Sequence, residues 1–225
     1  MLAFALISLD EVVAGAAALS ADERERADAI AKPLRRRQFI AGRLLLRRML
    51  AQALGGRSED FELDATAGAP PRMRSRPDLH LSVSHSREWV AAAIADRPVG
   101  IDIECLGARR DPPRFARWVC SPDEWKNWQA LDGAAADDAL ITHWTRKEAW
   151  LKREGGEVLL TRMHRLHAEP VAAAQADVAT WRLGEAAMLS LCVSRVADVV
   201  TPASIGRPAE WACMTDLRGG IAPDQ

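Results

Sequence analysis

Pro98-Val99-Gly100-Ile101-Asp102-Ile103-Glu104 stands in the middle of the chain, and the rest of the sequence is organised around it. Three apolar residues alternate here with Gly100, Asp102 and Glu104. Alternation with a period of two predicts a half-buried strand, on which both carboxylates leave by the same face. Like charges that neighbour each other on one strand face repel unless a cation lies between them. We therefore expect a divalent metal ion beside Asp102 and Glu104.

A second stretch, Trp144-Thr145-Arg146-Lys147-Glu148-Ala149-Trp150-Leu151-Lys152, follows about forty residues later. Trp144, Glu148 and Lys152 recur at i, i+4 and i+8, so they share one face of a helix. A third carboxylate is thus paired with an ammonium group one turn later. The two stretches together predict a magnesium site of three carboxylates with a lysine beside it, a set suited to handling a pyrophosphate.

Each motif alone also fits an ordinary structure. Asp102 and Glu104 could be exposed carboxylates on a solvated sheet face. Glu148 and Lys152 could form a common i,i+4 helix pair, which stabilises a helix by a few tenths of a kcal/mol. His85, between two serines, could be a hydrogen-bonded histidine at a strand end. Lys147 is expected on a different helix face from Glu148, where a purely structural role is open to it.

The composition is that of an ordinary globular protein. The 225 residues are 48% hydrophobic and 27% charged, enough for a good core in one domain or two small ones. A net charge of −1 gives no overall field that would favour nucleic acid or an anionic membrane. No window has the length of a membrane span, and the apolar N-terminus lacks the basic segment of a signal peptide. The four cysteines have no metal-site spacing, so we expect reduced thiols and a cytoplasmic protein.

The front half is predicted to mix helices and strands. A strand at residues 2–7 precedes a capping box at residues 8–11, which opens a helix to about residue 19. A second capping box at residues 20–23 starts a charged helix, and a long helix over residues 34–54 ends at Gly55-Gly56. Further strands are expected at residues 61–63, 79–83, 89–95 and 99–105, the last two joined by Asp96-Arg97-Pro98 as a hairpin.

The back half is predicted to repeat this layout after a linker at residues 106–113. A capped helix runs from Ser121-Pro122 to about residue 131, and a strong helix covers residues 137–153. Strands are expected at residues 158–160, 178–183, 187–193 and near 211–214, with those at 178–183 and 187–193 paired through a turn at Gly184-Glu185. We therefore expect an α+β fold of two similar subdomains in tandem, residues 1–104 and 105–225, with pseudo-twofold symmetry and the active site in the cleft between them.

The order of the motifs is more specific than any one of them. Ser84-His85-Ser86, then G-x-D-x-E at residues 100–104, then W-x-x-K-E-A-x-x-K at residues 144–152 resembles the Sfp-type 4′-phosphopantetheinyl transferases. Enzymes of this family move the phosphopantetheine arm of coenzyme A onto a serine of a carrier protein. The resemblance is anchored in residues 80–104 and 118–156 and extends loosely to the N-terminal helices. The family's fold, two similar α+β halves with coenzyme A between them, agrees with the tandem layout.

The resemblance implies a role for each matching residue. Asp102, Glu104 and Glu148 would be the magnesium ligands, and Glu148 would also act as the general base, directly or through water. Lys152 would lie near the reacting phosphate. The residues that would contact coenzyme A are Arg26, Arg43, Arg72, Ser84, His85 and Asp102.

The chain departs from the family at one place. Many relatives carry a Gly-Lys-Pro before the Ser-His strand and another basic residue slightly upstream, both for coenzyme A phosphates. The corresponding residues 65–70, Ala-Thr-Ala-Gly-Ala-Pro, contain no cation. Arg72, Arg74 and Arg76 are the candidates to supply it. The departure bears on the affinity and pose of coenzyme A more than on the chemistry.

The expected protein is a magnesium-dependent transferase that acts on an apo acyl or peptidyl carrier protein in fatty-acid or secondary-metabolite biosynthesis. A monomer is expected because one chain already holds both halves. Carriers of this kind are usually acidic, and the arginines that could dock one are Arg109, Arg110, Arg114 and Arg117. Two rivals stay open at this point: a non-catalytic relative that binds coenzyme A or the carrier, and a metal-dependent phosphohydrolase that uses the same three carboxylates.

Overall fold

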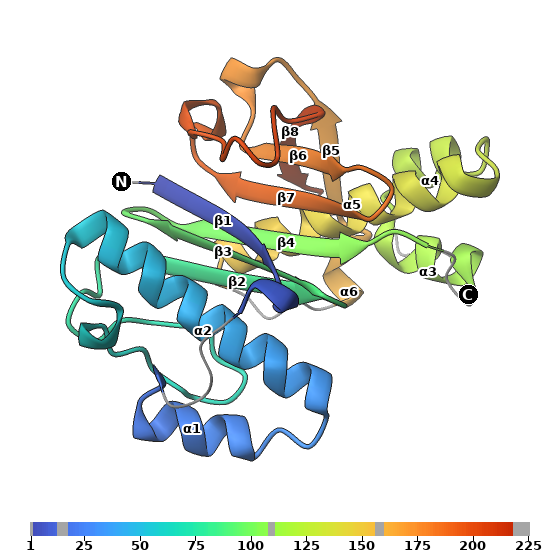
Figure 1. The fold of residues 1–225 in the computed structure, drawn as a ribbon. Helices are drawn as coiled ribbons and strands as arrows, with labels where there is room; N and C mark the ends of the chain where they lie inside the picture. Colours follow the sequence, from blue (N-terminus) through green and yellow to red (C-terminus); the bar gives the residue numbers. More distant parts are fainter. Residues whose placement is uncertain (1, 13–17, 108–110, 156–159, 218–225) are drawn as a thin grey trace.

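The structure, a computed structural model, describes residues 2–12, 18–107, 111–155 and 160–217. It contains two antiparallel sheets, and a long helix covers each of them (Figure 1). The elements of the front half are β1 (Leu2–Ser8), α1 (Ala21–Asp28), α2 (Pro33–Leu54), β2 (His80–Ser86) and β3 (Trp89–Ala95). Those of the back half are β4 (Val99–Cys105), α3 (Pro112–Val119), α4 (Pro122–Trp128), α5 (Gly133–Arg153), α6 (Leu160–Met163), β5 (Leu166–Pro170), β6 (Val178–Leu183), β7 (Ala187–Val193) and β8 (Glu210–Asp216).

The two sheets share one strand order. In the first sheet β3 lies between β1 and β2 and is antiparallel to both. In the second sheet β7 lies between β4 and β6 in the same way, and β8 and β5 extend the sheet beyond β6. The long helices α2 and α5 each follow the first strand of their half. This repetition confirms the predicted tandem α+β fold.

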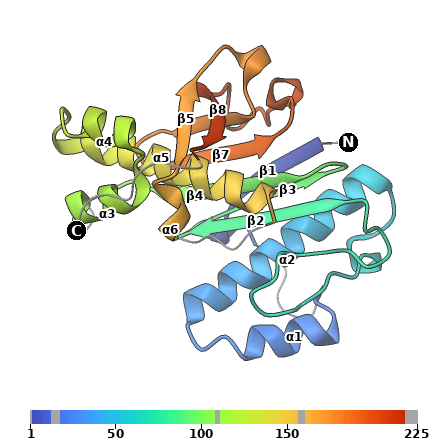
Figure 2. The same ribbon diagram turned by 180° about the vertical axis from the view of Figure 1, so that it is seen from behind.

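Three hydrophobic clusters hold these layers together. Val90, Ala92 and Ile94 of β3 pack against α2 on the outer face of the first sheet. The alternate residues of β3 belong to a central cluster that also contains Ile101, Ile103 and the inner residues of β7. A third cluster joins α3, α4 and α5 to the other face of the second sheet. Accordingly, α2 and α5 lie on opposite sides of the pair of sheets (Figures 1 and 2).

The first capping box forms, but it does not open the predicted helix. Ser8 accepts a hydrogen bond from the Asp10 amide and donates its own amide proton to Glu11. Only a 3-10 turn over Leu9–Glu11 follows, because the backbone is already extended at Val12. The rest of the predicted helix includes residues 13–17, which lie outside the described residues. The second capping box, between Ser20 and Glu23, opens α1 as expected.

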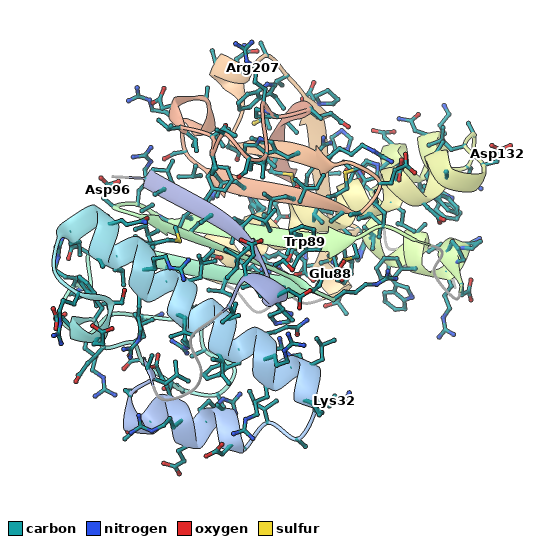
Figure 3. The ribbon with its side chains drawn as sticks, viewed as in Figure 1. Lys32, Glu88, Trp89, Asp96, Asp132 and Arg207 are labelled. Atoms are coloured by element: carbon teal, nitrogen blue, oxygen red, sulfur yellow. The ribbon has the colours of Figure 1, made fainter. Side chains whose placement is uncertain are left out.

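The predicted hairpin between residues 89–95 and 99–105 is wrong. The side chain of Trp89 marks one end of β3 and that of Asp96 lies beyond the other end (Figure 3). From Asp96 the chain crosses to the second sheet, where β4 pairs with β7 instead of β3. The turn residues at 96–98 indicate a change of direction but not which strands pair. The subdomain boundary at residues 104/105 stays a prediction, and it places β4 with a half whose sheet it does not join.

The remaining differences are local. Residues 61–63 form a single bridge, between Leu63 and Met73, in place of a strand. Of the predicted strand at 158–160, residues 158 and 159 lie outside the described residues and Leu160 begins α6. Helix α3 and strand β5 were not predicted. Among the described residues, no helix is long and apolar enough to cross a membrane.

Candidate active site

The site begins where α5 lies directly against β4. A Cβ atom built on Gly100 would lie 1.9 Å from the carbonyl oxygen of Ala149 and 2.6 Å from the amide nitrogen of Arg153. Only a glycine allows two backbones to approach this closely. Since Asp102 is two residues further along β4 and shares its face, its carboxylate is directed at the same helix.

At this contact Lys152 joins two of the predicted carboxylates. Its Nζ lies 2.6 Å from Asp102 Oδ1 and 3.3 Å from Glu148 Oε2. It also donates to the carbonyl oxygen of Ile101, at 3.2 Å. Asp102 is 1% exposed, while the side chains of Glu148 and Lys152 are 15% and 22% exposed. The structure therefore brings together one carboxylate from a strand and a carboxylate and ammonium from a helix, as the spacing predicts.

The electrostatics of this group are those of two carboxylates that share one cation. Burial and the neighbouring charge of Asp102 raise the pKa of Glu148 to about 8, although Lys152 opposes the shift. Burial would lower the pKa of Lys152, but the two carboxylates outweigh it and the net shift is upward. Lys152 is thus charged at neutral pH, whereas Glu148 takes up a proton readily. A second cation at this place would favour the ionised form of Glu148.

Glu104, the third predicted ligand, lies on the same face of β4 but is held separately. Its Oε2 accepts a hydrogen bond from the Ser86 hydroxyl at 2.9 Å. Among the described residues, three ligand groups come within 4.8 Å of one another at Cys120, Glu124 and His143, whereas the three predicted carboxylates do not. Asp102 thus shares a face of β4 with Glu104 and lies beside Lys152 and Glu148, but the three predicted carboxylates do not converge within 4.8 Å of one another.

Asp102 nevertheless has the chemistry that a magnesium ion requires. Its Oδ1 accepts from the Ser84 hydroxyl and from Lys152, both at 2.6 Å. Its Oδ2 is buried and has no hydrogen-bond partner. A buried carboxylate oxygen without a partner is costly unless a ligand satisfies it. Magnesium prefers carboxylate oxygens of this kind together with substrate phosphates, so the donor set fits the ion.

The cluster of Cys120, Glu124 and His143 already contains a cation of its own. The Lys147 ammonium bonds the Glu124 carboxylate and donates to the Val119 carbonyl oxygen at 2.6 Å. Glu124 also accepts from backbone amides, at 2.8 Å and 3.0 Å. The charge of Glu124 is balanced by Lys147, and its oxygens already accept hydrogen bonds. The cluster therefore links α5 to the start of α4. Lys147 is thus structural, as one of the two readings of the sequence allows.

A basic pocket of about 250 Å³ lies on the outer face of the first half. Arg26, Arg43 and His85 line it, all three predicted to contact coenzyme A. Arg35 joins them from α2, and none of the described lining residues is acidic. Burial and the charges of Arg35 and Lys152 lower the pKa of His85 to about 4, so its imidazole is neutral at pH 7. The pocket is suited to a ligand with several negative charges.

Arg43 is the most deeply placed of these cations. It is 7% exposed, and burial lowers its pKa in spite of the Glu23 carboxylate, which lies 3.9 Å away. Its Nη1 is buried without a hydrogen-bond partner. Glu23 is held mainly by Arg47, at 2.5 Å, and this buried pair anchors α1 to α2. A guanidinium with an unsatisfied donor in a basic pocket points to an anionic ligand.

Ser84 and His85 are neighbours in sequence but serve opposite faces of β2. His85 lines the basic pocket on the α2 side. The Ser84 hydroxyl is directed the other way, to Asp102. The cause is the period of two in a strand, which sends successive side chains to opposite faces. The structure thus places Ser84 with the carboxylates and does not bring it into the pocket with the other coenzyme A candidates.

The arginines proposed for the missing Gly-Lys-Pro cation are not in the pocket. Arg72 is exposed and does not line it. Arg74 pairs with Asp64 at 2.5 Å, and Arg76 pairs with Asp78 at 2.7 Å. Arg35 is the pocket cation that the sequence reading missed. A signal for it exists, because Arg35, Gln38, Phe39 and Gly42 all line the pocket and follow the i, i+3, i+4, i+7 spacing of one helix face.

Comparison with known proteins places the sequence in a family. A profile of the 4′-phosphopantetheinyl transferase superfamily matches residues 98–202. The chain is 30% identical to the 4′-phosphopantetheinyl transferase HetI of Nostoc over 187 residues, 81% of this chain and 79% of HetI. It is 28% identical to the transferase Sfp of Bacillus subtilis strain 168 over 61% of this chain and 66% of Sfp. It is also 28% identical to another Bacillus subtilis 4′-phosphopantetheinyl transferase over 139 residues, where it covers 61% of that relative. The chain therefore belongs to the Sfp-type branch of the 4′-phosphopantetheinyl transferase superfamily of enzymes.

Proposed function

We propose that this protein transfers the 4′-phosphopantetheine arm of coenzyme A to a serine of an apo acyl or peptidyl carrier protein, with magnesium as cofactor and 3′,5′-ADP as the second product. The observation that carries the proposal is the meeting of Asp102 with Glu148 and Lys152 at the contact of β4 with α5. The basic pocket on the other face of β2 supports it, because coenzyme A has phosphates at two places. We assign the reaction to the cytoplasm and the active unit to a monomer.

The proposed reaction needs a site that holds a pyrophosphate and removes a proton. The serine oxygen of the carrier attacks the β-phosphorus of coenzyme A, and the bond to the 3′,5′-ADP oxygen breaks. Asp102, Glu104 and Glu148 would hold the magnesium ion, which supplies positive charge to the pyrophosphate oxygens and keeps Glu148 ionised. Lys152 offsets negative charge that develops on the phosphates. Glu148 accepts the serine proton, directly or through one water.

The pocket residues have a separate task in this scheme. Arg26, Arg35 and Arg43 bind the 3′-phosphate end of coenzyme A by charge-assisted hydrogen bonds. Neutral His85 donates one hydrogen bond there. Because coenzyme A is held at its 3′-phosphate end, its pyrophosphate is oriented toward the carboxylates. Orientation is a major part of the catalysis of phosphoryl transfer.

The carrier is proposed to dock on α3. Arg114 and Arg117 lie on this helix, whose Trp118 is 46% exposed beside them. Two arginines next to an exposed tryptophan offer both charge and apolar area to an acidic helix. Arg109 and Arg110, the other two arginines predicted for docking, lie outside the described residues.

Incubation of the protein with an apo carrier, coenzyme A and magnesium tests the proposal. Mass spectrometry of the carrier should show the added phosphopantetheine arm, and nucleotide analysis should show an equal amount of 3′,5′-ADP. The same reaction with Asp102→Ala should show neither product. Cleaved coenzyme A with an unchanged carrier would instead make the protein a phosphohydrolase. Binding of coenzyme A or of the carrier without any product would make it a non-catalytic relative.

A further inference from the structure

Three serines of β2 face β4 along the junction of the two sheets. Ser82, Ser84 and Ser86 alternate along the strand, so their side chains share one face. β2 and β4 belong to different sheets, and each of the three serine hydroxyls makes a hydrogen bond that crosses between them. The three hydroxyls do not have the same partners. This difference separates a structural contact from contacts with the proposed metal ligands.

Ser82 makes only a backbone contact across this junction. Its hydroxyl oxygen accepts a hydrogen bond from the amide of Ile101 at 3.1 Å. Ser82 is 5% exposed, and the contact reaches no carboxylate. Ser82 is therefore an example of a serine that joins the two strands without contacting a proposed metal ligand.

Ser84 fixes the orientation of Asp102. Its hydroxyl and the Lys152 ammonium both donate to Oδ1, each at 2.6 Å. Because both donors hold the same oxygen, Oδ2 is left buried and without a hydrogen-bond partner. When one oxygen of a carboxylate is held by hydrogen bonds, the other oxygen keeps a fixed orientation in which it can bind a metal ion.

Ser86 holds Glu104 through its hydroxyl group, which accepts one hydrogen bond and donates another. The oxygen accepts from the amide of Cys105 at 3.1 Å. The proton is therefore directed to Glu104 Oε2, at 2.9 Å. A glutamate side chain has several rotatable bonds, and ordering it in advance removes that entropy loss from the binding step.

We propose that Ser84 and Ser86 are positioning residues for Asp102 and Glu104, and that they set the affinity of the site for its divalent cation. The inference rests on the proposed function, which takes these two carboxylates as metal ligands. Neither serine touches the substrate in this assignment. The serines act by holding a carboxylate in the orientation in which it binds the ion.

Direct titration with Mn²⁺, monitored by electron paramagnetic resonance, measures the affinity of the site for a divalent cation without any turnover. Ser86→Ala should weaken Mn²⁺ binding by about 10- to 100-fold, the usual effect of losing an outer hydrogen bond to a metal ligand. Ser84→Ala should weaken it similarly. Ser82→Ala, the matched control on the same strand face, should stay within about twofold of the unaltered protein. Ser86→Thr keeps the hydroxyl and suits a strand, so it should restore the affinity.

Kinetics gives a second readout. In Ser86→Ala the magnesium concentration for half-maximal rate should rise, while KM for coenzyme A at saturating magnesium should not change. Near-ultraviolet circular dichroism of each variant checks that the fold is retained. Equal weakening in Ser82→Ala and Ser86→Ala would overturn the inference, because the hydroxyls would then serve the junction alone. Unchanged Mn²⁺ affinity in Ser86→Ala, or no Mn²⁺ binding by the unaltered protein, would also overturn it.

The outcomes separate this inference from the proposed function. A protein that binds Mn²⁺ in a manner dependent on Ser86, but adds no arm to the carrier, would refute the transferase proposal and leave the positioning role standing. A protein that modifies the carrier, but whose Mn²⁺ affinity does not depend on Ser86, would refute the positioning role alone.

Discussion

Lys152 contacts both carboxylates that meet at the proposed reaction centre. It bonds Asp102 and Glu148 and is the ammonium nearest to both. Lys152→Ala should reduce kcat by about 10²- to 10³-fold, the usual effect of removing a group that stabilises transition-state charge. KM for coenzyme A should change much less, because the arginine pocket is intact. Lys126→Ala, at an exposed site on α4, is the control. A rise in KM at unchanged kcat would contradict the assignment.

Arg35 is expected to act on binding and not on the chemical step. It lines the basic pocket next to Arg26, and burial together with the charge of Arg26 lowers its pKa. Arg35→Gln should raise KM for coenzyme A by about tenfold or more, the loss of one charge-assisted hydrogen bond, at nearly constant kcat. Arg48→Gln, on α2 but outside the pocket, should leave both constants unchanged. Steady-state kinetics with varied coenzyme A distinguishes the two variants.

The stability of the fold should depend on pH because His143 is buried. Burial lowers its pKa to about 4, and Glu124 only partly opposes this. An unfolded histidine has a pKa near 6.5, so between pH 6.5 and 4 the unfolded state binds the extra proton and stability falls as the pH falls. In His143→Gln the free energy of unfolding should decline less steeply, by up to about 1.4 kcal/mol per pH unit. Urea unfolding from pH 7 to 5 measures this, and parallel curves for the two proteins would contradict it.

At the level of residues, local rules predicted the centre of the site but not its surroundings. The period of a strand puts Asp102 and Glu104 on one face, and the turn of a helix puts Glu148 beside Lys152. The meeting of that strand with that helix was expected only from the two motifs taken together. Arg35 was missed because its side chain meets the pocket only after α2 packs on the first sheet. The cluster around Lys147 joins residues far apart in the chain, and no local spacing indicates such a contact.

The contact of β4 with α5 is the element-level feature on which the site depends. Gly100→Ala would bring a methyl group against backbone atoms of Ala149 and Arg153, which cannot move aside cheaply. We expect a loss of stability of about 1–3 kcal/mol or more and a loss of activity, because α5 must move away from Asp102. In Gly42→Ala the nearest atom is a methyl carbon of Val83, at 3.0 Å, so the loss should be smaller. Thermal unfolding compares the stability of the two variants, and equal losses of stability would contradict the argument.

Elements with strong local signals were predicted well, but only one of the two predicted strand pairs formed. Helix α2 was predicted nearly to its ends because an apolar face runs its length and Gly55 stops it. The strands at 178–183 and 187–193 were predicted as a pair, and β6 and β7 pair as expected. The hairpin of β3 with β4 was wrong because a tight turn is equally compatible with strands that diverge into two sheets. Helix α3 was hidden by the prolines at its start, which also occur in linkers.

At the level of the whole molecule, one central cluster belongs to both halves. It contains Phe4 and Ala93 from the first sheet together with Ile101 and Leu189 from the second. Neither sheet can unfold or separate from the other without exposing this cluster to water, so we expect a single cooperative unfolding transition. Tryptophan fluorescence and far-ultraviolet circular dichroism should give coincident urea curves. Two separated transitions would show that the halves fold independently.

For the proposed reaction, the place of β2 between the basic pocket and the proposed metal ligands has a consequence for which nucleotides would be accepted. His85 contributes to the arginine-lined cavity, while the preceding residue, Ser84, holds Asp102 on the reverse side of the same extended strand. Because the two residues are consecutive on one strand, β2 ties the position of the pocket to that of the proposed metal ligands. A molecule with the same two anionic ends, but a longer or shorter connection between them, would engage one site and leave the other out of reach. In the proposed reaction, selectivity for coenzyme A would thus follow from spacing as well as from charge.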